Sequence, residues 1–380
     1  MTPEAAASLC CSAAANHIQR LLETSAIATS MAATTELLST PTVKRGRYMQ
    51  GGSIPPRKHS VWYLTDKKGD ELEFLNFTSL TRDSFSHLVS LNRHYIKTKT
   101  ITLAKGRMKR SRVGGRKFNS RDVVAMGLKY LLSPSLLKDL HVQFGASQTT
   151  FWELAWFAMD SFIVNVGRDA RGRVWWDRSE EHLASCAERT NAFLDIVGVV
   201  AMTDGDKLVS KSPQNYLHQN RDYNGWTKDV NRNLVLVWDP FGKIVDAAVN
   251  SPGNFHDSKT AWWCKIYKHM EGLPQGFKCC CDDAFKTQGN LKDKLVKTKE
   301  AYKEGNTRSH YDQQLTHLRQ CSEWGNNILT GVFRVMRSKL PTNNVNRAKI
   351  MWACIYLHNW RTETVGRNQI QTYFNNLVDE

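Results

Sequence analysis

Four acidic residues, far apart in the chain, stand where their carboxylates could meet: Asp204, Asp257, Asp282 and Glu323. Two of them follow directly on apolar runs, residues 196–203 and 277–281, which we predict to be buried strands. Another stands in a loop after the apolar run 244–249, and the last lies within a helical pattern. An aspartate just past the end of a buried strand is held on a rigid element and faces a crevice, as ligand-binding residues of open α/β sheets do.

Carboxylates gathered in this way repel one another, and each raises the pKa of its neighbours. A divalent cation removes that cost, and a cluster of oxygen ligands suits Mg²⁺ or Mn²⁺. Two such ions can activate an attacking oxygen and stabilise the leaving oxygen of a phosphodiester. Any one of these aspartates, taken alone, would more often be a turn residue or a helix cap. The spacing of all four, with the residues beside them, favours a metal site.

The strands that position these residues are predicted from apolar patterning. The runs 196–203 and 233–238 are apolar at successive positions and rich in Val and Leu. This pattern is typical of strands that helices cover on both faces. Asp-Pro-Phe-Gly at 239–242 is a turn signal, so we expect the runs before and after it to form an antiparallel hairpin.

Short motifs surround the acidic residues. They are Asp204-Gly205 after its apolar run, Pro252–Ser258, Cys281–Phe285, Arg319–Gly325 and Ile355–Asn359. With these motifs, residues 115–362 resemble the DDE transposases of the PIF/Harbinger superfamily and their domesticated nuclease relatives. The most specific match is Pro-Gly-Asn-Phe-His-Asp-Ser at 252–258, against the family's Pro-Gly-Ser-x-His-Asp-Ser.

The resemblance implies an α/β fold with an RNase H-like mixed sheet flanked by helices, preceded by a small helical domain like a helix-turn-helix. It implies that Asp204, Asp282 and Glu323 are catalytic and hold Mg²⁺ or Mn²⁺. Asp257 is then an auxiliary ligand or the alternative second aspartate. Asp283 competes with Asp282 for its place, although Phe285 at the family's tyrosine position favours Asp282.

The function that the resemblance implies is metal-dependent cleavage and joining of DNA strands by a transposase or a hydrolase derived from one. In the family, a separate Myb-like protein supplies end recognition and nuclear import, and we expect that partner here only by resemblance. Self-association of the chain stays open. Departures at Asp206-Lys207, Ala284 and Cys279–Cys281 keep a second interpretation alive, a domesticated nuclear DNA-binding or scaffold protein without turnover.

Composition agrees with a polyanionic partner. Lys and Arg number 52 and Asp and Glu 36, so the net charge is +16, which suits double-stranded DNA and a nuclear location. We expect no membrane span and no secretory leader. The nine cysteines lack paired metal spacing and indicate reduced thiols in an intracellular protein. The basic residues 105–112 indicate a solvated loop, a nuclear-import signal or a phosphate-contacting loop, and residues 286–312 indicate a surface that follows the DNA backbone or a flexible linker. Basic residues after Asp204 either contact phosphates or form a mobile basic loop: Lys207, Lys211, His218, Arg221, Lys228 and Arg232.

We predict four parts: a disordered segment 1–60, a helical domain 61–185, the RNase H-like domain 186–364 and a frayed tail 365–380. Within the helical domain, the segments 120–132, 136–144 and 147–157 have the outline of a helix-turn-helix. A three-helix support for the sheet is the alternative, and the very apolar third helix argues against its lying in a major groove.

Two expectations concern the helices around the site. A helix at about 258–271 has an apolar stripe, which includes Trp262 and Trp263 and which we expect to pack on the core. Further helices are expected at about 313–338 and 345–361. In the second of these, His358 and Asn359 are expected to form structural hydrogen bonds.

Overall fold

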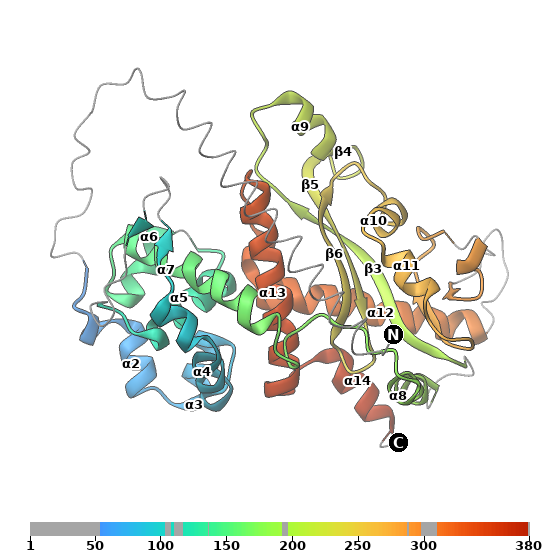
Figure 1. Ribbon diagram of the computed structural model, residues 1–380, viewed down its shortest axis with the longest axis horizontal. Helices are drawn as coiled ribbons and strands as arrows, with labels where there is room; N and C mark the ends of the chain where they lie inside the picture. The colour runs from blue at the N-terminus through green and yellow to red at the C-terminus, as the bar shows by residue number, and fades with distance from the viewer. Residues whose placement is uncertain are drawn as a thin grey trace.

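The computed structural model describes residues 54–102, 108–109, 117–135, 137–191, 197–286, 289–297 and 310–378. A helical layer formed by the first half of the chain lies against a sheet with helices on both faces (Figure 1). Most of the predicted disordered segment 1–60 and of the basic segment 105–112 lies outside the described residues. In the described part, no helix combines the length and the apolar character needed to cross a membrane.

The sheet is mixed. Its strands are β3 (Val199–Val209), β4 (Tyr223–Asn224), β5 (Asp229–Trp238), β6 (Ile244–Pro252), β7 (Lys278–Cys281) and β8 (Leu295–Val296). The order across the sheet is β6, β5, β3, β7, β8, with antiparallel pairs up to β3 and parallel pairs after it. β4 adds a short antiparallel pair at the start of β5. The predicted RNase H-like α/β fold and the β5–β6 hairpin are confirmed.

One strand is longer than predicted. β3 continues beyond Asp204 to Val209, so Asp204 lies in the middle of a strand and not past its end. The polar residues after Asp204 remain extended because β3 pairs with β5 from Met202 to Val209. Pairing with β7 stops at Thr203, so the β7 side of β3 is open from Asp204 onward. Asp282 does follow the end of β7, as predicted.

Both faces of the sheet are buried. Leu234, Leu236 and Trp238 of β5 belong to one hydrophobic cluster, and Val235 and Val237 belong to another. This alternation is the two-residue repeat of a strand. The first cluster joins the sheet to α12 (His310–Val332) and α13 (Asn344–Val365). The second joins it to α8 (Glu180–Asn191), α10 (Asp257–Trp263) and α11 (Ile266–Glu271).

The helical layer precedes the sheet. It contains α2 (Val61–Lys67), α3 (Glu71–Thr78), α4 (Arg82–Thr98), α5 (Ser120–Leu132), α6 (Leu137–Leu140), α7 (Gln148–Ser161) and the short strands β1 (Ile101–Thr102) and β2 (Met108–Lys109). Single turns are η2 (Arg57–His59), η3 (His141–Phe144) and the π-helical η4 (Phe162–Val166). The N-cap of α5 is Asn119, whose side chain and that of Asp122 form a reciprocal capping box.

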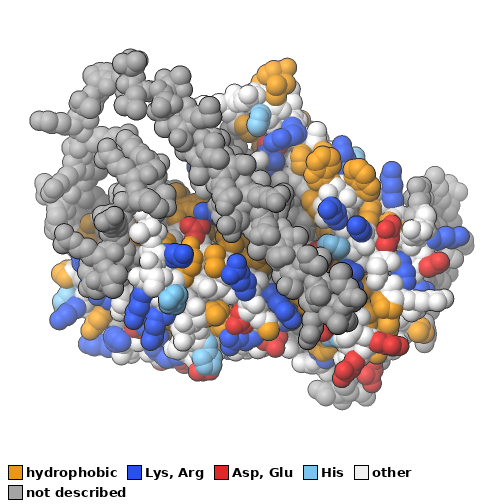
Figure 2. Space-filling model, viewed as in Figure 1, with side chains coloured by type: hydrophobic (Ala, Val, Ile, Leu, Met, Phe, Trp, Pro, Cys, Tyr) orange, Lys and Arg blue, Asp and Glu red, His pale blue; other side chains and the backbone are white. Residues whose placement is uncertain are grey.

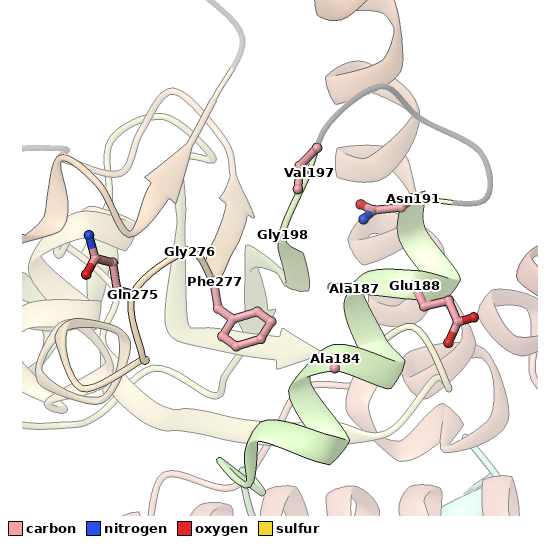
Figure 3. Close-up of a pocket in the computed structure, with 9 residues that line it drawn as sticks. All are labelled: Ala184, Ala187, Glu188, Asn191, Val197, Gly198, Gln275, Gly276 and Phe277. Carbon is pink, nitrogen blue, oxygen red and sulfur yellow. The ribbon is translucent and has the colours of Figure 1, made fainter.

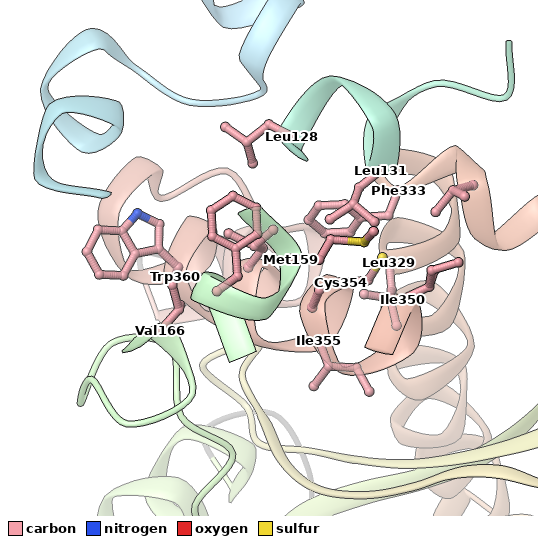
Figure 4. Close-up of a cluster of buried hydrophobic side chains, with 14 of the residues drawn as sticks. Leu128, Leu131, Met159, Val166, Leu329, Phe333, Ile350, Cys354, Ile355 and Trp360 are labelled. Carbon is pink, nitrogen blue, oxygen red and sulfur yellow. The ribbon is translucent and has the colours of Figure 1, made fainter. Parts of the chain in front are cut away.

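The third helix of the helix-turn-helix outline, α7, lies in the core. Phe151, Ala155 and Phe157 are buried. α5 and α7 share one hydrophobic cluster with α12 and α13, in which Leu131 and Met159 lie close to Phe333 and Cys354 (Figure 4). The apolar residues of α7 are thus used to pack against the other helices. The structure therefore favours the predicted supporting role of this helix over a role in reading DNA.

The C-terminal residues are not frayed throughout, in contrast to the prediction. Residues Gln369–Val378 form α14, and Ile370 and Phe374 are fully buried. Tyr373 packs edge-on against Trp324 of α12 at 5.1 Å between ring centroids. Spacings of three and four residues put these side chains on one face of the helix, which therefore docks on the core.

The helix predicted over 258–271 is two helices. The chain breaks between α10 and α11 at Lys265, which has a φ of 66°. Ile266, Tyr267 and Met270 pack in the core as expected, but Trp262 and Trp263 are exposed. The remaining short elements are α9 (Tyr216–Asp222), η5 (Gly289–Leu291) and η6 (Arg334–Arg337).

Candidate active site

Asp204 is held between β3 and α12. Asn326 of α12 donates a hydrogen bond from Nδ2 to Oδ2 of Asp204, at 3.2 Å. Trp238 of β5 in turn donates from Nε1 to Oδ1 of Asn326, at 3.2 Å. The helix can approach this closely because residue 325 is glycine: a Cβ there would lie 2.6 Å from the Trp238 ring. The sequence pattern pointed to Asp204 but gave no signal for the role of Asn326.

Asp257 approaches β3 from the other face. Adjacent residues of a strand point to opposite faces, and the Asp257 carboxylate occupies the space that a side chain on Gly205 would fill. A Cβ at Gly205 would lie 2.5 Å from Oδ1 and 2.7 Å from Oδ2 of Asp257. Oδ1 of Asp257 is buried and has no hydrogen-bond partner among the described residues. This oxygen is therefore a buried acceptor that the surrounding protein groups do not satisfy.

Asp282 and Glu323 are joined by a cation from α12. Arg319, one helical turn before Glu323, places Nη1 2.8 Å from Oε1 of Glu323 and 3.6 Å from Oδ1 of Asp282. Asp283 is exposed, and its backbone N–H donates to Asp282. Of the two neighbouring aspartates, Asp282 is the one that faces Arg319. Arg319 belongs to the motif that contains Glu323, but no sequence signal pointed to its contact with both carboxylates.

The electrostatics relate Asp204 to the other three carboxylates. Burial raises the pKa of Asp204 to about 7, and the charges of Asp282, Glu323 and Asp257 add to this effect against a hydrogen bond from the Gly205 N–H. Burial also raises the pKa of Asp257, opposed by the charge of Lys207. The negative charges of residues from α10, α12 and the end of β7 thus act on Asp204 of β3. That these four residues are the catalytic set stays a prediction.

The carboxylate ligands suit a divalent cation, but they are not arranged as a complete coordination site. Carboxylate oxygens are the ligands that Mg²⁺ and Mn²⁺ prefer, and the unpartnered Oδ1 of Asp257 is one such donor. Within the described residues, however, no three acidic, His or Cys side chains form a ready-made metal site. Arg319 supplies the positive charge between Asp282 and Glu323 instead. Binding of a cation there therefore requires Arg319 to release these carboxylates.

Residues 203–359 match the family described as DDE superfamily endonuclease. The matched segment contains all four acidic residues, and it confirms the similarity to DDE proteins that the motifs predicted. A cryo-EM structure of a piggyBac transposase synaptic complex with hairpin DNA is also similar, at 12% identity over 83% of this chain and 80% of that chain, with a TM-score of 0.34. Comparison with curated proteins gave no match.

Some polar residues in the DDE-like segment are structural. His358 lies 3.1 Å from the Gly242 carbonyl through Nε2, and burial lowers its pKa to about 4. Asn359 accepts a hydrogen bond from the Ile244 N–H and donates one to the Ile244 carbonyl. Arg232, which we expected among the candidate phosphate contacts, is buried in an ion pair with Asp222. This pair links the end of α9 to β5, and we call α9, β4 and the turn that leads into β5 the α9 hairpin.

A shallow pocket of about 530 Å³ lies away from the acidic site. Its walls come from α8 and from the residues that precede β3 and β7, including Val197 and Phe277 (Figure 3). Asp204 and Asp282 lie farther along these same strands or beyond them. The pocket is therefore separate from the candidate active site.

Proposed function

We propose that this protein is a divalent-metal-dependent DNA nuclease or transposase of the PIF/Harbinger type, which cleaves and joins DNA strands by two-metal phosphodiester chemistry. The observation that supports this most directly is the gathering of carboxylates from separate elements, since Arg319 contacts both Asp282 and Glu323 and the Asp257 carboxylate lies against Gly205, next to Asp204. The match of residues 203–359 to DDE superfamily endonucleases agrees with it.

Each residue of the site has an assigned role in this proposal. Asp204, Asp282 and Glu323 hold the cation, and Asp257 is an auxiliary ligand through its unpartnered Oδ1. Bound Mg²⁺ or Mn²⁺ supplies activation of the attacking oxygen and stabilisation of the leaving oxygen. Asn326 fixes the orientation of Asp204, and Arg319 balances the charge of Asp282 and Glu323 before the cation binds.

The substrate in this proposal is double-stranded DNA in the nucleus. The net charge of +16 favours a polyanion. A Myb-like protein that delivers the enzyme to its DNA, and association of copies of the chain on the two DNA ends, belong to the same proposal by resemblance to the family.

The first test is nicking of a supercoiled plasmid by the full chain with Mn²⁺. Asp204→Asn should lower the rate by more than about 100-fold, because even outer partners of metal ligands cost roughly 10–100-fold. Asp283→Asn is the matched control, since this exposed neighbour should leave the rate within a few-fold of the original. Equal nicking by the Asp204→Asn variant would show that the activity arises elsewhere.

A second candidate function is a DNA-binding scaffold that has kept the fold without turnover. The arrangement of Arg319 favours it, because this side chain already neutralises two of the four carboxylates. Calorimetric titration with Mn²⁺ separates the two functions. Binding that Asp204→Asn abolishes supports the nuclease, and DNA binding without any Mn²⁺ binding supports the scaffold.

A further inference from the structure

An exposed aromatic surface adjoins the candidate active site. Trp262 and Trp263 of α10 are 66% and 63% exposed, and Trp226, in the turn between β4 and β5, is 89% exposed. Indole side chains are large and apolar, and most are largely buried. We call these residues, with others nearby, the aromatic surface: Tyr216, Leu217, Tyr223, Trp226, Phe255, Trp262 and Trp263.

Hydrogen bonds join the two halves of this surface, which are the α9 hairpin and the segment that leads into α10. The N–H of Asn254 donates to the carbonyl of Arg221 at 3.2 Å, and Asn224 Nδ2 donates to the carbonyl of Gly253 at 2.7 Å. Phe255 then packs 6.0 Å from Trp263 between ring centroids. The α9 hairpin and α10 therefore lie together at one end of the sheet (Figure 1). Figure 2 shows both apolar and basic side chains on the surface in this region.

The charge of the surface is positive. Lys228, Lys259 and Lys265 are exposed, and Lys259 Nζ lies 4.0 Å from the centre of the Phe255 ring. Only two carboxylates occur in residues 216–228 and 254–265. One is Asp222, which is buried in its pair with Arg232, and the other is Asp257 of the candidate active site.

The surface also has a fixed position relative to the acidic site. Asp257 is the first residue of α10, and Trp263 is the last. At 1.5 Å per residue, the indole is carried about 9 Å along the helix axis from the candidate metal ligand. On the same helix, Lys259 precedes Trp262 and Trp263 by three and four residues, so the three side chains share one face.

We propose that the aromatic surface binds unpaired bases of a DNA strand next to the site of cleavage. The faces of bases within a duplex are covered by their neighbours, whereas those of an unpaired strand are free to stack on indole rings. Such stacking tolerates any sequence, and flanking lysines contact the phosphates. This inference rests on the proposed function, because it assumes that DNA is the substrate. It adds that the aromatic surface holds the unpaired part of that DNA.

The test compares two fluorescent DNA probes, a blunt duplex and the same duplex with a short single-stranded extension. Binding of the full chain is measured by anisotropy with EDTA, so that the readout does not depend on cleavage. Each base that stacks contributes about 1–3 kcal/mol, so the Trp262→Ala/Trp263→Ala variant should lose about 5-fold or more in affinity for the extended probe. Its affinity for the blunt duplex should stay within two-fold or so of the original.

Two further variants sharpen the comparison. Trp262→Phe/Trp263→Phe keeps aromatic faces and should retain most of the preference for the extended probe. Leu72→Ala removes an equally exposed apolar side chain from α3 and should change neither affinity. Thermal unfolding of every variant should match that of the original chain, because the replaced side chains are exposed.

Several results would overturn the proposal. The alanine variant could bind both probes as before, or lose affinity for both equally. Sedimentation could show instead that it breaks an association between copies of the chain while the preference for the extension persists, which would make the surface a protein interface. Failure of the proposed function is distinguishable, because a chain that does not nick DNA with Mn²⁺ can still show or lack this preference in EDTA.

Discussion

At the scale of single residues, two glycines allow the close contacts around Asp204. Asp257 reaches β3 only because residue 205 has no Cβ, and α12 reaches Trp238 only because residue 325 has none. These glycines make close approach of a carboxylate and of a helix possible without any positive φ at either position. The chemistry of the site therefore depends on neighbours that carry no functional group.

Gly205→Ala tests this dependence. The added methyl group overlaps the Asp257 carboxylate, which must move, so we expect Mn²⁺ affinity to fall and plasmid nicking to fall with it. Gly225→Ala is the matched control, because a Cβ there meets nothing within 4 Å and the backbone needs no positive φ. Calorimetry with Mn²⁺ measures the effect. Unchanged binding by Gly205→Ala would mean that Asp257 takes no part in holding the cation.

At the scale of elements, a buried ion pair anchors the α9 hairpin. Asp222, at the end of α9, is fully buried against Arg232 of β5, and Arg221 contributes a second contact at 3.3 Å. Burial lowers the pKa of Arg232 to about 10, which shows how strongly this site disfavours an isolated charge. The pair fixes the hairpin that carries Trp226 and so positions one half of the aromatic surface.

Asp222→Asn should destabilise the protein strongly. The substitution leaves the buried Arg232 without its counter-charge, and breaking a buried pair in this way costs about 3–5 kcal/mol. Glu363→Gln, which removes a partly exposed pair with Lys243, should cost no more than about 1 kcal/mol. Urea unfolding of both variants gives the comparison. A small loss for Asp222→Asn would indicate that water reaches Arg232.

At the scale of the whole molecule, α13 connects the parts. Its apolar side chains share one core with α5, α7 and α12, and its buried His358 and Asn359 bind the backbone of the β5–β6 hairpin. His358 stays neutral in the folded protein because burial lowers its pKa from 6.5 to about 4. Folding is thus linked to pH through a residue far from the acidic site in sequence.

The sign of this linkage follows from the two pKa values. Below pH 6.5 the unfolded chain takes up a proton at His358, whereas the folded chain does so only below about pH 4. Above pH 6.5, the free energy of unfolding therefore does not change with pH through His358. It falls by on the order of 3 kcal/mol as the pH decreases from 6.5 toward 4. His358→Gln should flatten this part of the pH profile of urea unfolding. His87→Gln, at an exposed position, should not, and equal slopes for both variants would contradict the assignment.

Much of the fold and of the site could be predicted from the sequence. Apolar runs at 233–238 and 244–249 with a turn between them specify a hairpin, because buried strands need continuous apolar residues. Asp204, Asp257, Asp282 and Glu323 were predicted from their spacing and motifs, and the charges of the other three raise the pKa of Asp204 in the folded protein. These features are local, since each depends on a few consecutive residues.

Other features were decided by tertiary contacts. β3 runs on past Asp204 because β5 supplies hydrogen-bond partners for polar residues that would otherwise leave the sheet. Trp262 and Trp263 have the same apolar pattern as a core stripe, yet they are exposed, and the helix breaks after them at Lys265. Ile370 and Phe374, in a segment predicted to be frayed, are buried. The burial of these apolar residues, and the contact of Arg319 with both Asp282 and Glu323, depend on elements that are distant in the chain. The sequence alone therefore determined where strands form and which acidic residues are candidates. Only the tertiary structure decided which residues they contact, because those contacts join distant segments.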